Sequence, residues 1–200
     1  MNFMAKRTPF VSAILIIGIL SLGACSGDSE QTPAKTAPAA QSSPPRLLDD
    51  PARGPFSGFE NARFGSDERT VRNAWKGLLR EGGGTSDSCR QLFQEPRPAG
   101  GFGISFMLEN GHFVRYDTDS RERLAPRGLQ VGSSAQQIRA TFPGHFEEQP
   151  HKYVEGASYF IVTPYDGSQA RLVFEVGNDG LVQRWRIGLP PAVYYVEGCS

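Results

Sequence analysis

Apolar side chains recur at the helical period in two segments of the chain. In the first segment they lie three or four residues apart, at Val71, Ala74, Trp75 and Leu78. Ser66 precedes them as a natural N-cap, and the acidic residues after it suit the positive end of a helix dipole. We expect a helix that begins after Ser66 and ends at the sequence EGGG (81–84).

The second helical segment repeats this arrangement. Apolar residues recur at the helical period over 135–142, and the pair Ser133 and Gln136 has the spacing of a capping box. A Pro-Gly pair at 143–144 ends the pattern.

After each helix the apolar period changes to two, which predicts strands. GISFMLENGHFVRYDT (103–118) alternates around Asn110-Gly111, the strongest short signal for a hairpin, and ARLVFEVGNDGLVQRWRIG (170–188) repeats the device. HKYVEGASYFIVTPYDG (151–167) predicts another hairpin, and PAVYYVEG (191–198) predicts a final strand. The pattern as a whole predicts an α+β fold with antiparallel sheets.

Two stretches of this pattern are similar to each other. FGSDERTVRNAW (64–75) aligns with VGSSAQQIRATF (131–142), and MLENGHFVRYD (107–117) aligns with EVGNDGLVQRWRI (175–187). Self-similarity at a period of about 70 residues indicates a repeated structural unit. We expect two tandem repeats, 56–125 and 126–200, each a short helix packed on an antiparallel meander sheet.

The N-terminus has the organisation of a secretory signal peptide. Lys6 and Arg7 precede a short uncharged apolar run, which is too short for a spanning helix. The run ends in LGAC (22–25), which resembles the lipobox of bacterial lipoproteins. This resemblance implies a lipoprotein signal peptide over 1–24 and lipidation of Cys25, with a chance cysteine after an ordinary signal peptide as the alternative.

The same resemblance implies a location. In Gram-negative lipoproteins an aspartate after the lipidated cysteine favours retention in the inner membrane, and this chain has Ser26 there. We expect a lipid-anchored protein of the outer membrane that faces the periplasm. Residues 25–55 are rich in Pro, Ala and Ser and poor in apolar residues, which predicts a disordered tether.

The distribution of charge along the chain argues against nucleic acid as a partner. The chain has 21 basic and 21 acidic side chains, and the basic ones form no cluster of the kind that neutralises phosphates. We expect no nucleic-acid partner.

The folded part resembles two known groups over roughly residues 56–200. A glycine before a short capped helix, followed by an antiparallel meander, is similar to the β-lactamase-inhibitory-protein-like fold, which has two such units. It also resembles the SmpA/OmlA family of small outer-membrane lipoproteins, which has one. Both resemblances imply binding to another protein.

A third resemblance covers most of the mature chain. ARFGSDERTV (62–71), Cys89, PHKYVEGAS (150–158) and YYVEGCS (194–200) are similar to a group of uncharacterised proteobacterial lipoproteins, some of them labelled lectins. The group adds little biochemistry beyond a hint of carbohydrate binding.

Cys89 and Cys199 form an even pair once Cys25 carries lipid. In an oxidising compartment such a pair predicts a disulfide. A reactive free thiol and a metal site are the alternatives, although neither cysteine has another cysteine or a histidine at ligand spacing.

The densest cluster of polar and aromatic residues lies in HKYVEGASYF (151–160). It contains the candidate ligand-binding residues His151, Lys152, Tyr153, Glu155 and Tyr159. Tyrosines with neighbouring charges are typical of surfaces that bind proteins or sugars. The alternative is that both tyrosines are core residues of a pleated strand.

Trp185 is a sixth candidate for ligand binding. Its neighbours Arg184 and Arg186 share the opposite face of the strand, where ion pairing with Glu175 is the ordinary expectation. An exposed Trp185 would favour binding, whereas its alignment with Tyr116 favours a shared core position.

No catalytic or metal-binding motif stands out. The sequence has no GxSxG, and EGGGTSD (81–87) lacks the lysine of a phosphate-binding loop. His145 and His151 lie near two glutamates, but their spacing matches no regular metal motif. We expect no enzymatic activity, no cofactor and no metal.

Together these features predict a membrane-anchored periplasmic lipoprotein that acts as a binding or scaffold module for protein partners of the cell envelope. The alternative is a lectin-like lipoprotein that binds envelope sugars.

Overall fold

The computed structural model describes residues 54–82, 86 and 88–199. These residues all belong to one unit of the chain, Ser43–Ser200. The expected signal peptide, Cys25 and all but the last two residues of the expected tether lie outside the described residues.

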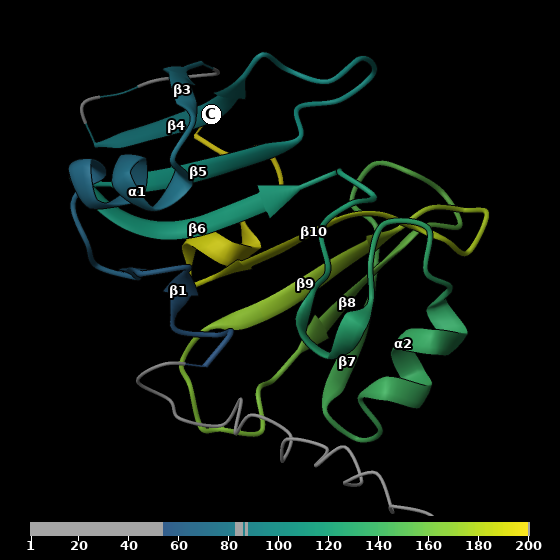
Figure 1. The fold of residues 1–200 in the computed structure, drawn as a ribbon. Coiled ribbons are helices and arrows are strands. Elements are labelled where there is room, and N and C mark those ends of the chain that lie inside the picture. Colours follow the sequence, from purple (N-terminus) through teal and green to yellow (C-terminus); the bar gives the residue numbers. More distant parts are fainter. Residues whose placement is uncertain (1–53, 83–85, 87, 200) are drawn as a thin grey trace, which may run out of the picture. The chain divides into compact units, whose positions relative to one another are not determined.

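The described strands form a small hairpin and one eight-stranded antiparallel sheet (Figure 1). The order of strands in the large sheet is β3-β4-β5-β6-β10-β9-β8-β7. The elements are β1 (Gly58–Phe59), β2 (Ala62–Arg63), α1 (Glu68–Trp75), β3 (Leu78–Glu81), β4 (Cys89–Glu95), β5 (Ile104–Glu109), β6 (His112–Thr118), the 3₁₀ turn η1 (Pro126–Gly128), α2 (Ala135–Thr141), β7 (Phe146–Pro150), β8 (Ser158–Val162), β9 (Arg171–Val176), β10 (Val182–Gly188) and the 3₁₀ turn η2 (Ala192–Tyr194). The α+β class expected from the sequence is confirmed.

Helix α1 is shorter than expected. It begins at the N-cap Asp67, whose carboxylate accepts the Thr70 amide N–H at 2.9 Å, and not at Ser66. It ends at Trp75 because Lys76 takes a left-handed conformation (φ 58°). Leu78 therefore begins strand β3, with its side chain exposed, and does not continue the helix.

Helix α2 has the expected capping box one residue further along the chain. Ser134 accepts the Gln137 amide N–H at 3.2 Å, and the Gln137 side chain accepts the Ser134 amide N–H at 2.8 Å. The expected pair Ser133 and Gln136 is therefore wrong by one position, because the Ser133 hydroxyl instead accepts the Gln130 amide N–H.

The hairpin signal at Asn110-Gly111 is confirmed. Asn110 and Gly111 both have positive φ (48° and 80°) and join β5 to β6, as a tight hairpin turn requires. The hairpin expected within 151–167 is displaced, because β7 precedes the segment, residues 151–157 form the loop and β8 is its second strand.

The main core lies on the face of the sheet that carries both helices. Val71 and Ala74 of α1 and Ile138 of α2 are buried there against strand residues. The hairpin β1–β2, which the sequence pattern does not predict, closes this core with Phe59, whose ring lies 5.0 Å from that of Phe106. Aromatic rings thus fill the space between the first helix and the sheet.

The opposite face of the sheet is covered by the C-terminal segment 189–199, which we call the strap. The final strand expected over 191–198 is wrong, since the strap contains only the turn η2. Pro190 and Pro191 have no amide N–H and cannot extend the ladder of β10. The turn, drawn in yellow in Figure 1, instead contacts β6, β9 and β10.

The disulfide between Cys89 and Cys199 is present, as expected. It joins β4 to the last described residue of the strap, with 5.5 Å between the two Cα atoms. The bridge links positions separated by 110 residues, so it ties the strap to β4, the second strand from the end of the sheet that lies far from β7.

Loss of this disulfide should destabilise the fold. For a loop near this size, chain entropy sets an upper value of about 4.7 kcal/mol, and we expect the double variant Cys89→Ser/Cys199→Ser to lose about 2 to 4 kcal/mol of unfolding free energy. Urea denaturation of the full-length chain measures this. Dithiothreitol should lower the stability of the wild-type chain and leave that of the double variant unchanged; equal stability of both chains would contradict the expectation.

Candidate functional site

Five of the six candidate residues lie together at the hairpin between β7 and β8. His151, Lys152, Tyr153 and Glu155 occupy the loop between the two strands, and Tyr159 is the second residue of β8. The Tyr159 ring is buried on the strap side of the sheet, against Val193, whereas Tyr153 is 58% exposed. Tyr159 is thus a core residue, whereas Tyr153 is a surface residue.

Trp185 does not belong to this cluster. Its ring is 3% exposed and lies 5.8 Å from that of Tyr116 in the core on the helix side. Successive residues of a strand face opposite sides of a sheet, so Trp185 points away from the strap. The rings of Tyr153, Tyr159 and Trp185 therefore do not converge on one site.

The His151 side chain hydrogen-bonds to the backbone of its own loop. Its Nδ1 accepts the backbone N–H groups of Tyr153 and Val154, each at 3.0 Å. A nitrogen that accepts carries no proton, so Nε2 carries it and donates to the Glu175 carboxylate at 3.2 Å. The imidazole also stacks on the Tyr159 ring, with centroids 4.6 Å apart. The His151 side chain thus holds the loop backbone in place, and its contacts with Glu175 and the Tyr159 ring hold the side chain itself.

Glu175 connects His151 to two arginines. Its carboxylate lies 3.4 Å from Nε of Arg184 and 3.6 Å from Nη1 of Arg186, which is the ion pairing expected from the sequence. Arg184 is partly exposed, whereas Arg186 is buried. Burial, and then the charge of the neighbouring Arg115, lowers the pKa of Arg186 to about 10, so this guanidinium is charged at neutral pH.

Arg115 is the second buried arginine on this face. Its guanidinium pairs with the Asp117 carboxylate, with 2.8 Å between Nε and Oδ2, and it donates to the carbonyl oxygens of Ala192 (2.9 Å) and Tyr195 (2.6 Å). Arg186 likewise donates to the Val193 carbonyl at 2.7 Å. The two arginines therefore hold the strap against the sheet by its backbone.

Arg115 and Asp117 were not among the residues that the sequence predicted for the site. They lie two residues apart in a predicted strand, so they share one face, and opposite charges at that spacing were an available signal. No sequence signal marks their partners, because the carbonyl groups of the strap belong to a segment that was expected to form a strand.

Above this network lies a surface formed by the loop and the strap, which we call the loop–strap surface. Its exposed members are Lys152, Tyr153, Val154, Tyr194 and Glu197. The Tyr153 hydroxyl contacts the Glu197 carboxylate, and the Lys152 ammonium lies 3.6 Å from the same carboxylate and 4.9 Å from the centre of the Tyr153 ring. These contacts join the loop to the strap. Glu155 is exposed in the same loop.

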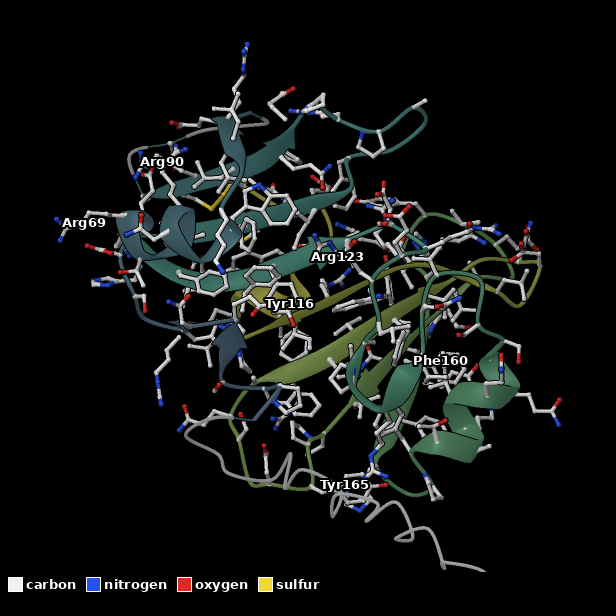
Figure 2. All side chains as sticks on the ribbon, viewed as in Figure 1. Arg69, Arg90, Tyr116, Arg123, Phe160 and Tyr165 are labelled. Carbon is white, nitrogen blue, oxygen red and sulfur yellow. A yellow bond between two sulfur atoms is a disulfide. The ribbon has the colours of Figure 1, made fainter. Side chains whose placement is uncertain are left out.

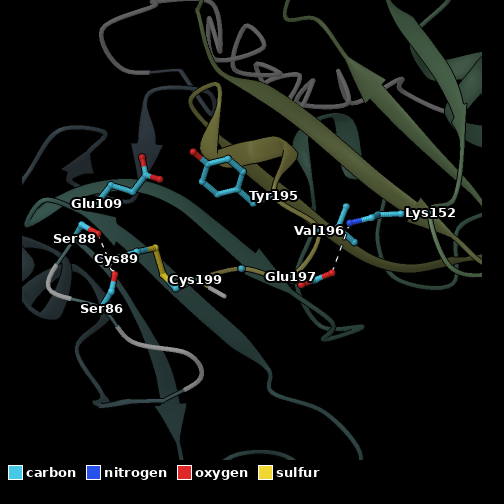
Figure 3. A pocket seen from close by; sticks show the side chains of 10 residues that line it. Ser86, Ser88, Cys89, Glu109, Lys152, Tyr195, Val196, Glu197 and Cys199 are labelled. Atoms are coloured by element: carbon cyan, nitrogen blue, oxygen red, sulfur yellow. Dashed lines mark hydrogen bonds and ion pairs between the residues drawn. A yellow bond between two sulfur atoms is a disulfide. The ribbon is translucent and has the colours of Figure 1, made fainter.

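A pocket of about 520 Å³ opens beside the disulfide (Figure 3). Glu109 and Tyr195 lie on one side of it, and Lys152 and Glu197 lie on the other. Burial raises the pKa of Tyr195, and the Glu109 carboxylate raises it further, so this phenol keeps its proton. The pocket extends the loop–strap surface toward Cys199.

The helix side carries a second, separate hollow. Arg123 lies with its guanidinium 4.8 Å from the centre of the Trp75 ring and 5.8 Å from that of Phe59, and Figure 2 shows it beside Tyr116. Burial lowers the pKa of Arg123. Pockets of about 430 and 490 Å³ flank this side chain, and Trp185 lines the larger one. Arg123 itself lines both pockets.

The three histidines make separate contacts. The His145 ring lies against that of Tyr165 at a tilt, with 3.7 Å between their centroids. His151 is bound to Glu175, and the exposed His112 contacts the Gly65 carbonyl. Within the described part of the chain, no group of three or more His, Cys, Asp or Glu side chains has a metal-binding arrangement.

Comparisons with known proteins assign no family. No family model and no curated protein matches this sequence. Among solved structures, the chain is similar to the uncharacterized protein YfeY from Escherichia coli, with 15% identity over 66% of this chain and 97% of that one and a TM-score of 0.46.

Two further structures are similar at lower values. An extracellular protein containing an SCP domain from Bacillus anthracis has 9% identity over 64% of this chain and 44% of that one, with a TM-score of 0.45. The DUF4309 family protein YjgB from Bacillus subtilis has 10% identity over 62% and 78%, with a TM-score of 0.37. In the described residues no helix is long and apolar enough to cross a membrane.

The role of His151 can be tested by His151→Phe. Phenylalanine keeps a ring against Tyr159 but leaves the N–H groups of Tyr153 and Val154, which lie in an exposed loop, without their acceptor. We therefore expect a loss of about 0.5 to 1.5 kcal/mol of unfolding free energy. Amide hydrogen exchange at residues 153 and 154 should accelerate. The matched control is His145→Phe, which keeps a ring against Tyr165 and should leave both amides unchanged. Unaltered exchange in His151→Phe would contradict this role.

Proposed function

We propose that this protein is a lipid-anchored lipoprotein of the outer membrane that faces the periplasm and binds a protein partner of the cell envelope through its loop–strap surface. The proposal is for binding without catalysis. One observation carries it: exposed Tyr153, Val154 and Tyr194 lie on two segments whose backbones are fixed by buried arginines and a buried histidine.

This arrangement suits protein recognition for two physical reasons. Tyrosine is enriched among residues that dominate binding energy at protein interfaces, because its ring is large and its hydroxyl can find a partner. A surface that is already ordered loses less conformational entropy on binding. His151 holds the loop, and Arg115 and Arg186 hold the strap, so the exposed rings need little further ordering.

The anchor is proposed from the sequence. The apolar run before LGAC favours lipidation of Cys25, and two or more acyl chains give stable membrane attachment. The disulfide between Cys89 and Cys199 supports an oxidising compartment such as the periplasm. The tether expected over 25–55, about 30 residues, could extend to roughly 100 Å, which would let the folded part meet a partner away from the membrane.

We further propose that the two halves are tandem repeats. The succession α1, β3 to β6 has the same order as α2, β7 to β10. Gly65 and Gly132 both have φ of 91°. The Gly65 amide N–H donates to the Phe113 carbonyl, and the Gly132 amide N–H donates to the Val182 carbonyl, at positions that the sequence alignment had paired.

Carbohydrate binding is the second candidate. The exposed Tyr153 ring, with Lys152 and Glu197 beside it, offers a stacking face and charged groups that could orient hydroxyls. Burial of Tyr159 and Trp185 removes the other two rings from this role and makes it the weaker proposal.

Site-specific photocrosslinking tests the proposed surface. A photoreactive phenylalanine at position 153 of the full-length chain, in growing Gram-negative cells, should give a covalent adduct with one envelope protein. With that protein purified, Tyr153→Ala/Val154→Ala should weaken binding by about tenfold or more.

Tyr165 provides the matched control, because it is also exposed and lies in the turn between β8 and β9. The crosslinker at 165 should give no such adduct, and Tyr165→Ala should bind normally. Equal adducts at both positions would refute the proposed surface. Retention on envelope glycans that depends on Tyr153, without a protein adduct, would favour the carbohydrate alternative.

The anchor predicts a mass and a location. Intact mass spectrometry of the mature wild-type chain should show a chain that begins at Cys25 and carries acyl groups. Cys25→Ser should remain unprocessed at this site and leave the outer-membrane fraction. An unmodified Cys25 in a soluble mature chain would overturn the lipoprotein assignment.

A further inference from the structure

A small pocket of about 200 Å³ lies under the strap and on the same face as the loop–strap surface. Its walls come from four adjacent strands: Glu147 and Gln149 of β7, Tyr159 and Ile161 of β8, Val173 of β9 and Arg186 of β10. Tyr194 of the strap completes the lining. The pocket is therefore built on the sheet, between the edge strand β7 and the turn η2.

One donor in this pocket has no acceptor. The side chain of Tyr159 is 6% exposed, and its O–H donates to no residue that the structure describes, although the Lys152 backbone N–H approaches the hydroxyl oxygen. Burial raises the pKa of Tyr159, and the Glu175 charge raises it further, so the hydroxyl keeps its proton. A buried O–H without a partner is costly, which indicates a place for an acceptor atom.

The second donor is the guanidinium of Arg186, which is 3% exposed and has its centre 5.5 Å from the centre of the Tyr159 ring. Its Nε donates to Val193, and Nη1 lies 3.6 Å from the Glu175 carboxylate, too far for a hydrogen bond. A guanidinium has five N–H groups in a planar fork. Within the described residues its terminal amino groups make no hydrogen bond.

We propose that this pocket binds a carboxylate group. One carboxylate oxygen accepts from the Tyr159 hydroxyl, and the other accepts from the terminal N–H groups of Arg186. Arginine forks and carboxylates match in geometry and charge, and both donors lie in a partly desolvated site where such bonds are strong. Ile161 and Val173 provide apolar walls for the carbon atoms next to the carboxylate.

The carboxylate has two possible carriers of the same chemistry. It can belong to a free small acid, or to an acidic side chain or C-terminus of the partner bound at the loop–strap surface, since Tyr194 belongs to both the surface and the pocket. The second case rests on the proposed function, whereas the carboxylate site itself does not.

The charge of Glu147 provides a second test of the carboxylate site. Its carboxylate is at the exposed edge of the pocket, where Gln149 donates to it at 2.9 Å. A negative charge there opposes a bound carboxylate, so its removal should tighten binding. Glu147 thus acts against binding while Tyr159 and Arg186 act for it.

The test is a titration of the full-length chain in detergent micelles, labelled with ¹⁵N-arginine. Sodium acetate should produce a saturable shift of the Arg186 side-chain signal, which is assigned by its proximity to the Tyr159 ring protons; sodium chloride at equal ionic strength should not. Tyr159→Phe removes only the unpaired hydroxyl and should weaken acetate binding about tenfold. Its thermal midpoint should equal or exceed that of the wild type, which excludes a folding defect.

The Glu147→Gln variant should bind acetate about two- to fivefold more tightly, by loss of a nearby like charge. The matched control is Glu155→Gln, an exposed glutamate of the neighbouring loop, which should not change the affinity. No saturable shift with acetate, or equal affinity in the wild type and Tyr159→Phe, would overturn the carboxylate site.

Two peptides distinguish the carriers. Acetyl-Gly-Glu-Gly-amide offers a side-chain carboxylate, and acetyl-Gly-Gly-Gly offers a terminal one; a peptide bound more tightly than acetate indicates a polypeptide carrier. If acetate binds but no protein adduct forms at position 153, the carboxylate site stands and the proposed function fails. If the adduct forms and acetate does not bind, the proposed function stands and the carboxylate site fails.

Discussion

The strap depends on hydrogen bonds from two buried arginines, and the rest of this face of the sheet depends on the strap. The strap forms one 3₁₀ turn and pairs with no strand, and leaving its buried carbonyl groups without donors would cost free energy. Arg115 serves the carbonyls of Ala192 and Tyr195, and Arg186 serves that of Val193. Asp117 and Glu175 balance the two cations, so the layer between sheet and strap is buried and close to neutral.

The same charge layer reaches the surface. Glu175 lies between Arg186 and His151, and His151 fixes the amides of Tyr153 and Val154. The groups that hold the strap therefore also hold the neighbouring loop. This continuity explains why exposed side chains can be well positioned on segments that contain neither α-helix nor strand, and it links the proposed binding surface to the stability of the fold.

Local signals predicted much of this architecture, and long-range contacts account for what they missed. Alternation and the Asn110-Gly111 turn predicted the central hairpin, and cysteine pairing in an oxidising compartment predicted the disulfide. The end of α1 depends on Lys76 in a left-handed conformation, which the helical spacing of Leu78 conceals. The strap was mistaken for a strand because its partners are arginine side chains on distant strands. For the candidate site, clustering in the sequence located the loop around His151, but no sequence signal reveals that Tyr159 and Arg186 share a pocket.

The join between the two halves imposes one more constraint on this face. Gly188 of β10 lies opposite Arg115 of β6, and a Cβ atom at position 188 would lie 2.7 Å from both the Arg115 Cβ and the Val114 carbonyl oxygen. Any larger residue would push the two strands apart or displace Arg115. Because Arg115 holds the strap, the absence of a side chain at 188 is what allows the central strands to pair closely while the strap stays hydrogen-bonded. The pairing of β6 with β10 and the attachment of the strap through Arg115 thus both depend on Gly188.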